Sequence, residues 1–127
     1  MCIRDRFKRI NDEFGHGVGD RVLSAIANVL SQQCAPHLVV RHGGEEFAVL
    51  LSGLDLQAAT AMLDRARATT ASRRFRNRDS QAGLGQITFS AGVTAIQPGE
   101  EQEHAFARAD RLLYSAKSDG RDRVHAA

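Results

Sequence analysis

Two adjacent carboxylates, Glu45 and Glu46, directly follow the glycine pair Gly43 and Gly44 between two apolar runs. Glycine permits a tight turn and lets a bulky anion approach the backbone. Carboxylate oxygens and substrate phosphates are the ligands that Mg²⁺ prefers. Neighbouring strand residues point to opposite faces, so one carboxylate would face a site while the other faces away. The motif predicts either a metal and phosphate site or a solvated acidic turn, and these residues alone leave both open.

A second polar group lies near the start of the chain, where Gly15 precedes His16 and Gly19 precedes Asp20: Asn11, Asp12, His16 and Asp20. A carboxylate accepts hydrogen bonds from the ring N–H and the exocyclic amine of guanine, and an amide both donates and accepts. A site built on such pairs rejects adenine, because its polar groups would be left unpaired. The alternative is structural, with Asn11 and Asp12 in a turn and Asp20 as a helix N-cap.

Two cations, Lys117 and Arg121, flank Gly120 at the end of a helical pattern. They could offset the negative end of that helix. They could equally bind a phosphate, to which arginine offers a fork and lysine a point charge.

The remaining basic cluster, Arg73, Arg74, Arg76 and Arg78, has only Phe75 interleaved. A nucleic-acid patch usually brings more aromatic residues or a reader motif. A net charge of +2 is also too small to imply such a partner. We therefore interpret this segment as a solvated loop and expect no nucleic-acid partner.

The size and composition predict one soluble domain. The chain has 127 residues, of which 43% are hydrophobic, and that is enough for one core. No apolar run approaches the length of a membrane span, and no signal-peptide pattern occurs. The two cysteines, Cys2 and Cys34, form no disulfide or metal framework, which fits a reducing compartment.

Helical and strand patterns alternate along the chain. Apolar runs around Gly43 and Gly44 predict a hairpin whose strands are covered on both faces. Asp55 is a candidate N-cap, and Gly120 a C-terminal stop. Inward positions of the last helix are expected at Phe106, Ala109, Leu113 and Ala116. The expected elements are helices at 19–33, 56–70 and 103–118, strands at 38–40, 47–51 and 87–95, and a loop at 72–85.

Together these groups resemble the GGDEF domain of bacterial diguanylate cyclases. The signature turn is Gly43-Gly44-Glu45-Glu46-Phe47, the GGEEF form. Around it stand FKRINDEFGHGVGDRVL (7–23), ITFSAGV (87–93) and ADRLLYSAKSDGRDRV (109–124). The resemblance implies an α/β fold, an α+β sandwich like that of nucleotidyl cyclases, with a central, mainly antiparallel sheet flanked by helices.

The resemblance also implies an activity. The family condenses two GTP molecules into cyclic di-GMP, a bacterial second messenger, and releases pyrophosphate. It needs Mg²⁺ or Mn²⁺ and a homodimer, because each of two facing domains holds one GTP. The implied location is the cytoplasm, with a sensory domain upstream in a parent protein that can be membrane-anchored.

Carried over position by position, the family's pattern gives roles to nine residues and a supporting place to Glu46. Glu45 would bind the metal and help to deprotonate the attacking 3′-hydroxyl. Asn11 and Asp20 would hold the guanine with His16 nearby, and Gly43 and Gly44 would let the nucleotide lie against the turn. The cations implied at the phosphates are Lys8, Lys117 and Arg121.

The amino terminus departs from the family, whose first strand ends in Asp-x-Asp-x-Phe-Lys. The second Asp is kept as Asp5, in a supporting place, but Ile3 occupies the position of the first, metal-binding Asp. We interpret residues 1–127 as one partial domain that lacks the first helix and most of the first strand, with residues 1–5 as a foreign or truncated start. The expected consequence is impaired catalysis. The alternative is a catalytically silent module that binds GTP or a partner protein and regulates a neighbouring domain.

Many family members also carry an inhibitory Arg-x-x-Asp motif before the turn. Here Cys34-Ala35-Pro36-His37 takes its place, and neither charge is present. We therefore predict no product inhibition through this segment.

Overall fold

The computed structural model describes residues 10–75, 83 and 85–127. Residues 10–14 are helical, and Gly15 separates them from the next helix. The elements that follow are α2 (His16–Gln33), β1 (Leu38–Gly43), β2 (Glu46–Leu50), α3 (Leu56–Ser72), β3 (Ala91–Val93), α4 (Gln102–Ser118) and β4 (Val124–Ala126). The three predicted helices and the hairpin are confirmed, with shifted ends.

Helix α2 forms because its apolar residues recur on one face. Val18, Val22, Ile26 and Leu30 are all buried there. The helix begins at His16, three residues earlier than predicted, after Gly15 at a φ of 86°. The idea of Asp20 as an N-cap is therefore wrong, since Asp20 lies within the helix and Gly15 precedes its first residue.

Helix α3 begins where the sequence predicts. The Asp55 side chain accepts a hydrogen bond from the Ala58 backbone N–H at 2.7 Å, which satisfies one of the free donors of the first turn. The helix runs to Ser72, so the predicted loop begins one residue later, at Arg73. Residues 76–82 and 84 of that loop lie outside the described part of the chain.

The hairpin pairs β1 with β2 in antiparallel register, with Val39 opposite Val49 and Arg41 opposite Phe47. Phe47 is buried, and Val49 packs against the core. The opposite face carries Leu38 (58% exposed) and Leu50 (49% exposed). The prediction that both faces are covered is therefore wrong for the described residues, because strand alternation sends only every second apolar residue to the core.

The strand predicted over 87–95 is shorter than expected. Ile87, Phe89 and Ala91 keep the alternation and are buried. Only Ala91–Val93 form β3, which pairs in parallel with β4. Periodicity reports which side chains are buried, whereas strand assignment also requires a hydrogen-bonded neighbour.

In α4, Leu113 and Ala116 are buried as predicted, but Phe106 is 43% exposed. Its ring instead lies against His42, with the two ring centroids 4.8 Å apart. The helix ends at Ser118, and Gly120 follows its C-cap at a φ of 118°, as expected of a glycine stop.

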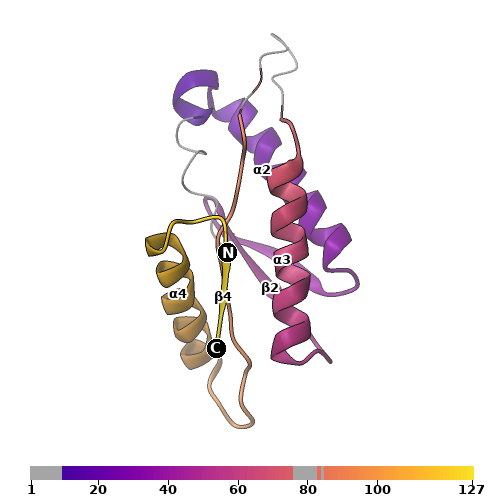
Figure 1. Cartoon of the computed structure of the whole chain (residues 1–127), viewed down its shortest axis with the longest axis vertical. Coiled ribbons are helices and arrows are strands. Elements are labelled where there is room, and N and C mark those ends of the chain that lie inside the picture. The colour runs from indigo at the N-terminus through magenta and orange to yellow at the C-terminus, as the bar shows by residue number, and fades with distance from the viewer. Residues whose placement is uncertain (1–9, 76–82, 84) are drawn as a thin grey trace.

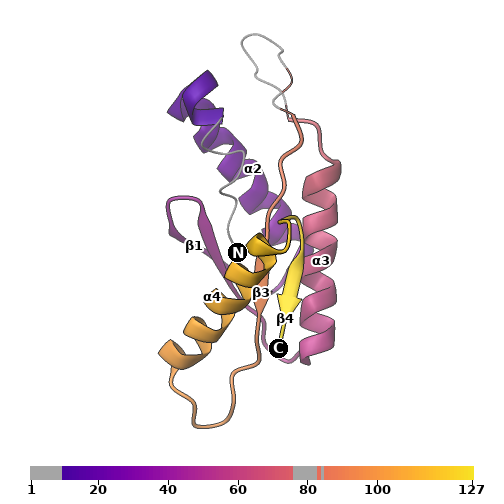
Figure 2. The same cartoon turned by 60° about the vertical axis from the view of Figure 1, so that its left-hand side comes forward.

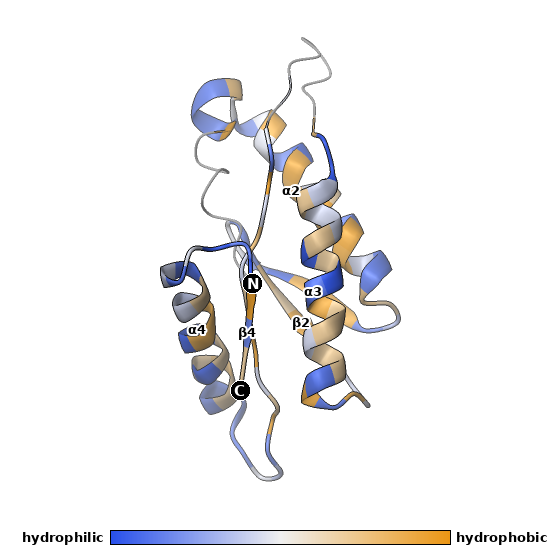
Figure 3. Ribbon diagram, in the orientation of Figure 1, coloured by the Kyte–Doolittle hydropathy of each residue, from blue (hydrophilic) through white to orange (hydrophobic). Residues whose placement is uncertain are grey.

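The elements form layers (Figure 1). The pair β3–β4 lies between α4 on one side and α3 on the other, and α2 packs against α3 and β1 (Figure 2). Hydrophilic and hydrophobic residues alternate along each helix, as expected when one face is buried (Figure 3). The described residues contain one antiparallel and one parallel strand pair, with helices on both sides.

Candidate functional site

The glycine turn between β1 and β2 is open to a ligand. A Cβ atom added at Gly43 or Gly44 would have no atom within 4 Å, so packing within the described protein does not require either glycine. Gly44 has a φ of 27°, and its carbonyl accepts a hydrogen bond from Arg41 Nε at 2.8 Å. At these two glycines, the space that a side chain would occupy is therefore not filled by any described residue.

The two carboxylates of the turn differ in environment, as the sequence predicts. Glu45 is half-buried between the strands, whereas Glu46 is exposed at the first position of β2. One carboxylate is thus held close to the protein and the other faces solvent, which fits one residue at a site and one in support.

Among the described residues, Asn11 has a buried side-chain oxygen, Oδ1, that lacks a hydrogen-bond partner. A buried acceptor without a partner costs about 1–3 kcal/mol, so such an atom calls for an explanation. A donor on a bound molecule, such as the N–H of a nucleobase, would supply the missing partner.

The chain direction near Asn11 is set by Gly15. The Gly15 N–H donates to the Asn11 carbonyl at 2.9 Å and closes the first helical segment. Its positive φ then starts α2 in a new direction. His16, the first residue of α2, and Asp20, just over one turn later, are both exposed.

Lys117 and Arg121 lie at the C-terminal end of α4. Lys117 is half-buried in the last turn, and Arg121 is exposed in the loop that follows. Arg121 has a φ of 64° and Asp122 a φ of 47°, both in the left-handed region that side chains rarely adopt. This is an unusual backbone for two consecutive residues that are not glycine.

In both views the tip of the β1–β2 hairpin and the amino-terminal end of α2 lie on the same side of α3 as α4 (Figures 1 and 2), and His42 beside the tip contacts Phe106 of α4. The elements that carry the three predicted groups therefore lie on one side of α3. Three further predicted positions, Lys8, Asp5 and Ile3, lie outside the described residues.

The donor set for a metal is small. Within residues 10–75, 83 and 85–127, no group of three His, Cys, Asp or Glu side chains is placed to hold a metal ion. Mg²⁺ is commonly bound by one or two carboxylates together with substrate phosphates. The half-buried Glu45 fits the carboxylate part of such a set, and the remaining ligands would have to come from the substrate.

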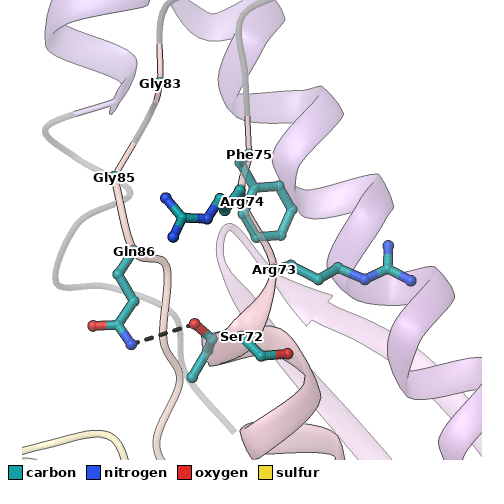
Figure 4. A pocket seen from close by; sticks show the side chains of 8 residues that line it. Ser72, Arg73, Arg74, Phe75, Gly83, Gly85 and Gln86 are labelled. Carbon is teal, nitrogen blue, oxygen red and sulfur yellow. Dashed lines mark hydrogen bonds between the residues drawn. The ribbon is translucent and has the colours of Figure 1, made fainter.

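A separate open pocket of about 610 Å³ lies at the end of α3 and is lined by Arg73, Arg74, Phe75 and neighbouring residues. Figure 4 shows Arg74 reaching across the pocket and Arg73 pointing away from it. Gln86 Nε2 donates to the Ala71 carbonyl at 3.3 Å and joins its two sides. None of the predicted site residues lines this pocket.

The segment in place of an inhibitory Arg-x-x-Asp motif has structural roles. Cys34 is fully buried at the end of α2, and burial raises the pKa of its thiol. His37 Nδ1 accepts a hydrogen bond from the Ser52 N–H at 3.2 Å. Cys34 is therefore part of the core, and one ring nitrogen of His37 is engaged by the backbone.

One contact near the site was missed by the sequence analysis. Arg67 of α3 pairs with Asp122 at 2.9 Å and with Asp64 at 2.7 Å. The hydrogen bond that Arg67 donates to Asp64 is the main reason that the pKa of Arg67 is raised. Positions 67 and 122 are 55 residues apart, and no periodic pattern connects them.

Comparison with known proteins identifies the family of the chain. The family described as "Diguanylate cyclase, GGDEF domain" matches residues 1–123. The chain therefore belongs to the GGDEF-domain family, and the recognition of its signature turn is confirmed.

Particular relatives support the assignment. The chain is 45% identical over 124 residues to diguanylate cyclase DgcP of Pseudomonas aeruginosa, covering 97% of this chain and 18% of that protein. It is 43% identical over 125 residues to diguanylate cyclase DgcM of Escherichia coli, covering 97% of this chain and 29% of that protein. The chain thus spans less than a third of the length of either relative.

Solved structures confirm the fold class. The GGDEF domain of DgcB from Caulobacter crescentus, in complex with c-di-GMP, matches with a TM-score of 0.92 and 37% identity over 96% of this chain and 72% of that one. In the described part of this chain, no helix is long and apolar enough to cross a membrane.

Proposed function

We propose that this chain is a GTP-binding diguanylate cyclase domain, which condenses two GTP molecules into cyclic di-GMP and pyrophosphate. The observation that carries the proposal is the buried Oδ1 of Asn11, which has no hydrogen-bond partner. The glycine turn, where an added Cβ would meet no described atom, accompanies it. Membership of the GGDEF family gives both features a common purpose.

In this proposal the base and the phosphates are held by different elements. Asn11 and Asp20 bind guanine, with His16 beside them, and Gly43 and Gly44 let the nucleotide lie against the turn. Lys8, Lys117 and Arg121 neutralise the phosphates, and Glu46 and Asp5 support the site. Each side chain thus positions or neutralises, which is the usual protein contribution to phosphoryl-type transfer.

Glu45 would hold the metal through its carboxylate and accept the proton of the attacking 3′-hydroxyl. When bound, Mg²⁺ or Mn²⁺ would neutralise charge on the phosphates. The 3′-oxygen of one GTP forms a bond to the α-phosphorus of the other, and pyrophosphate leaves from that phosphorus. Since each GTP attacks the other, two copies of the domain must face each other as a homodimer.

We further propose that catalysis by this chain is impaired. Ile3 replaces the aspartate that the family's pattern places on the first strand. A site that relies on Glu45 and substrate phosphates would bind Mg²⁺ weakly. The setting proposed is the cytoplasm of a bacterium, where a sensory domain upstream in the parent protein would pair two copies.

The same substitution favours a second candidate, a catalytically silent module that binds GTP or a partner protein. Binding of GTP without conversion would identify this second function.

The test is nucleotide binding by the full chain, measured by calorimetry with GTP and ATP. We expect a clear preference for GTP, which Asn11→Ala reduces by roughly tenfold or more because a buried polar contact is lost. Glu103→Ala is the matched control, since Glu103 is an exposed carboxylate of α4 with no assigned place in the site, and it should leave the preference unchanged. Equal binding of ATP and GTP by the unmodified chain would contradict the proposal.

A further inference from the structure

The loop after α4 has three consecutive residues with positive φ: Gly120 at 118°, Arg121 at 64° and Asp122 at 47°. Glycine adopts this region without penalty, and aspartate is enriched there, but arginine is not. A non-glycine residue keeps such a conformation only where its surroundings hold it. The contacts of this loop therefore show what fixes Arg121 in place.

Backbone contacts hold the two ends of the loop. The Arg121 N–H donates to the Ala116 carbonyl at 3.0 Å and ties the loop to the last turn of α4. The Arg123 carbonyl accepts from the Ala91 N–H at 3.0 Å where β4 joins β3. Arg123 Nε also donates to the Arg121 carbonyl at 3.0 Å.

The middle of the loop is held by a side chain from another helix. Arg67 Nη1 pairs with Asp122 Oδ1 at 2.9 Å, and Arg67 Nε pairs with Asp64 Oδ1 at 2.7 Å. The Arg67 side chain is only 20% exposed, so this pair is screened less than a surface pair. Asp64 orients the Arg67 guanidinium through Nε, while Nη1 of the same group reaches Asp122 in the loop. A guanidinium can bind two carboxylates in fixed directions in this way, whereas the single ammonium group of lysine cannot.

We propose that Arg67 is a positioning residue for nucleotide binding: by pairing with Asp122 it holds Arg121 in the left-handed conformation from which Arg121 binds the terminal phosphates of GTP. The inference rests on the phosphate-binding role given to Arg121 in the proposed function. In this proposal Arg67 contacts neither the base nor the phosphates and acts only through the loop that carries Arg121.

The experiment compares the affinity of the full chain for GTP, in the presence of Mg²⁺, with its affinity for guanosine, which has no phosphates. Arg67→Ala should lower the affinity for GTP by roughly tenfold, the scale of one charge-assisted contact, and leave guanosine binding unchanged. Unchanged guanosine binding also shows that the variant is folded. Arg65→Ala is the matched control, because Arg65 is an exposed arginine of the same helix, and it should change neither affinity.

Two conservative variants separate positioning from simple charge. Arg67→Lys keeps the charge but not the fork, so it should lose most of the GTP affinity that Arg67→Ala loses. Asp122→Asn keeps an acceptor and tolerates the left-handed region, so its loss should be smaller. Full GTP affinity in Arg67→Lys would overturn the proposal.

A double variant that combines Arg67→Ala with Arg121→Ala tests most directly whether Arg67 acts through Arg121. If Arg67 acts through Arg121, the double variant Arg67→Ala/Arg121→Ala binds GTP as Arg121→Ala does alone. Additive losses, or full GTP affinity in Arg67→Ala while Arg121→Ala is weakened, would overturn the inference.

The unmodified chain separates this inference from the proposed function. Guanosine bound as tightly as GTP would overturn the inference and leave guanine recognition standing. A chain that binds neither molecule would overturn both.

Discussion

Gly92 offers a quantitative test of how β3 and α4 are packed. A Cβ atom added there would overlap the Ala109 carbonyl oxygen and lie 2.6 Å from the Leu113 backbone nitrogen and 2.9 Å from Leu112 Cβ. Two of these neighbours are backbone atoms of α4, which cannot rotate away. Gly92→Ala must therefore push α4 from β3, at a cost of about 3 kcal/mol, the upper end for overpacking in cores.

The assay is thermal unfolding followed by circular dichroism. A loss of about 3 kcal/mol lowers the midpoint by roughly 10 °C for a domain of this size. The control is Gly17→Ala, because Gly17 lies inside α2 with no atom within 4 Å of an added Cβ. That variant should stabilise by about 0.5–1 kcal/mol through helix propensity. A midpoint for Gly92→Ala equal to or above that of the unmodified chain would refute the packing of β3 against α4.

Three further predictions concern pH, metal and product. Arg108 donates hydrogen bonds to Glu100 and lowers the pKa of that carboxyl to about 2. The stabilising contribution of this pair is therefore complete above pH 4.5 and is lost as the pH falls towards 2. Glu100→Gln should weaken the acid dependence of the unfolding midpoint, and an unchanged pH profile in this variant would contradict the prediction. Mg²⁺ without nucleotide should bind only at millimolar concentrations or above, because Glu45 is the one carboxylate assigned to it, and calorimetry showing micromolar binding would disprove this. Micromolar cyclic di-GMP should not inhibit through Cys34 and His37, and inhibition that His37→Ala abolishes would show otherwise.

Local physical rules predicted the parts of the fold that depend on neighbours in sequence. Gly43 and Gly44 predicted the turn because a tight reversal between apolar runs favours glycine. Asp55 predicted the start of α3 because its side chain can reach a free N–H only three residues ahead. The signature residues predicted the family for the same reason, since they are consecutive in the chain.

Features that depend on distant residues were not predictable in this way. The alternating burial of Ile87 and Phe89 looks like a continuous strand, but β3 comprises only Ala91–Val93, the residues that pair with β4. The position of Phe106 depends on His42, which lies on a different element. The pair of Arg67 and Asp122 likewise exists only after α3 and β4 have come together.

The most direct test of the proposed activity is conversion of GTP in the presence of Mg²⁺, followed by chromatography, for this chain beside Ile3→Asp. We expect little cyclic di-GMP from the unmodified chain and a marked gain from Ile3→Asp, because a second carboxylate would complete the metal site. Absence of product from both chains, with GTP still bound, would contradict the cyclase assignment and favour the silent regulatory module. Rapid turnover by the unmodified chain would contradict the predicted impairment.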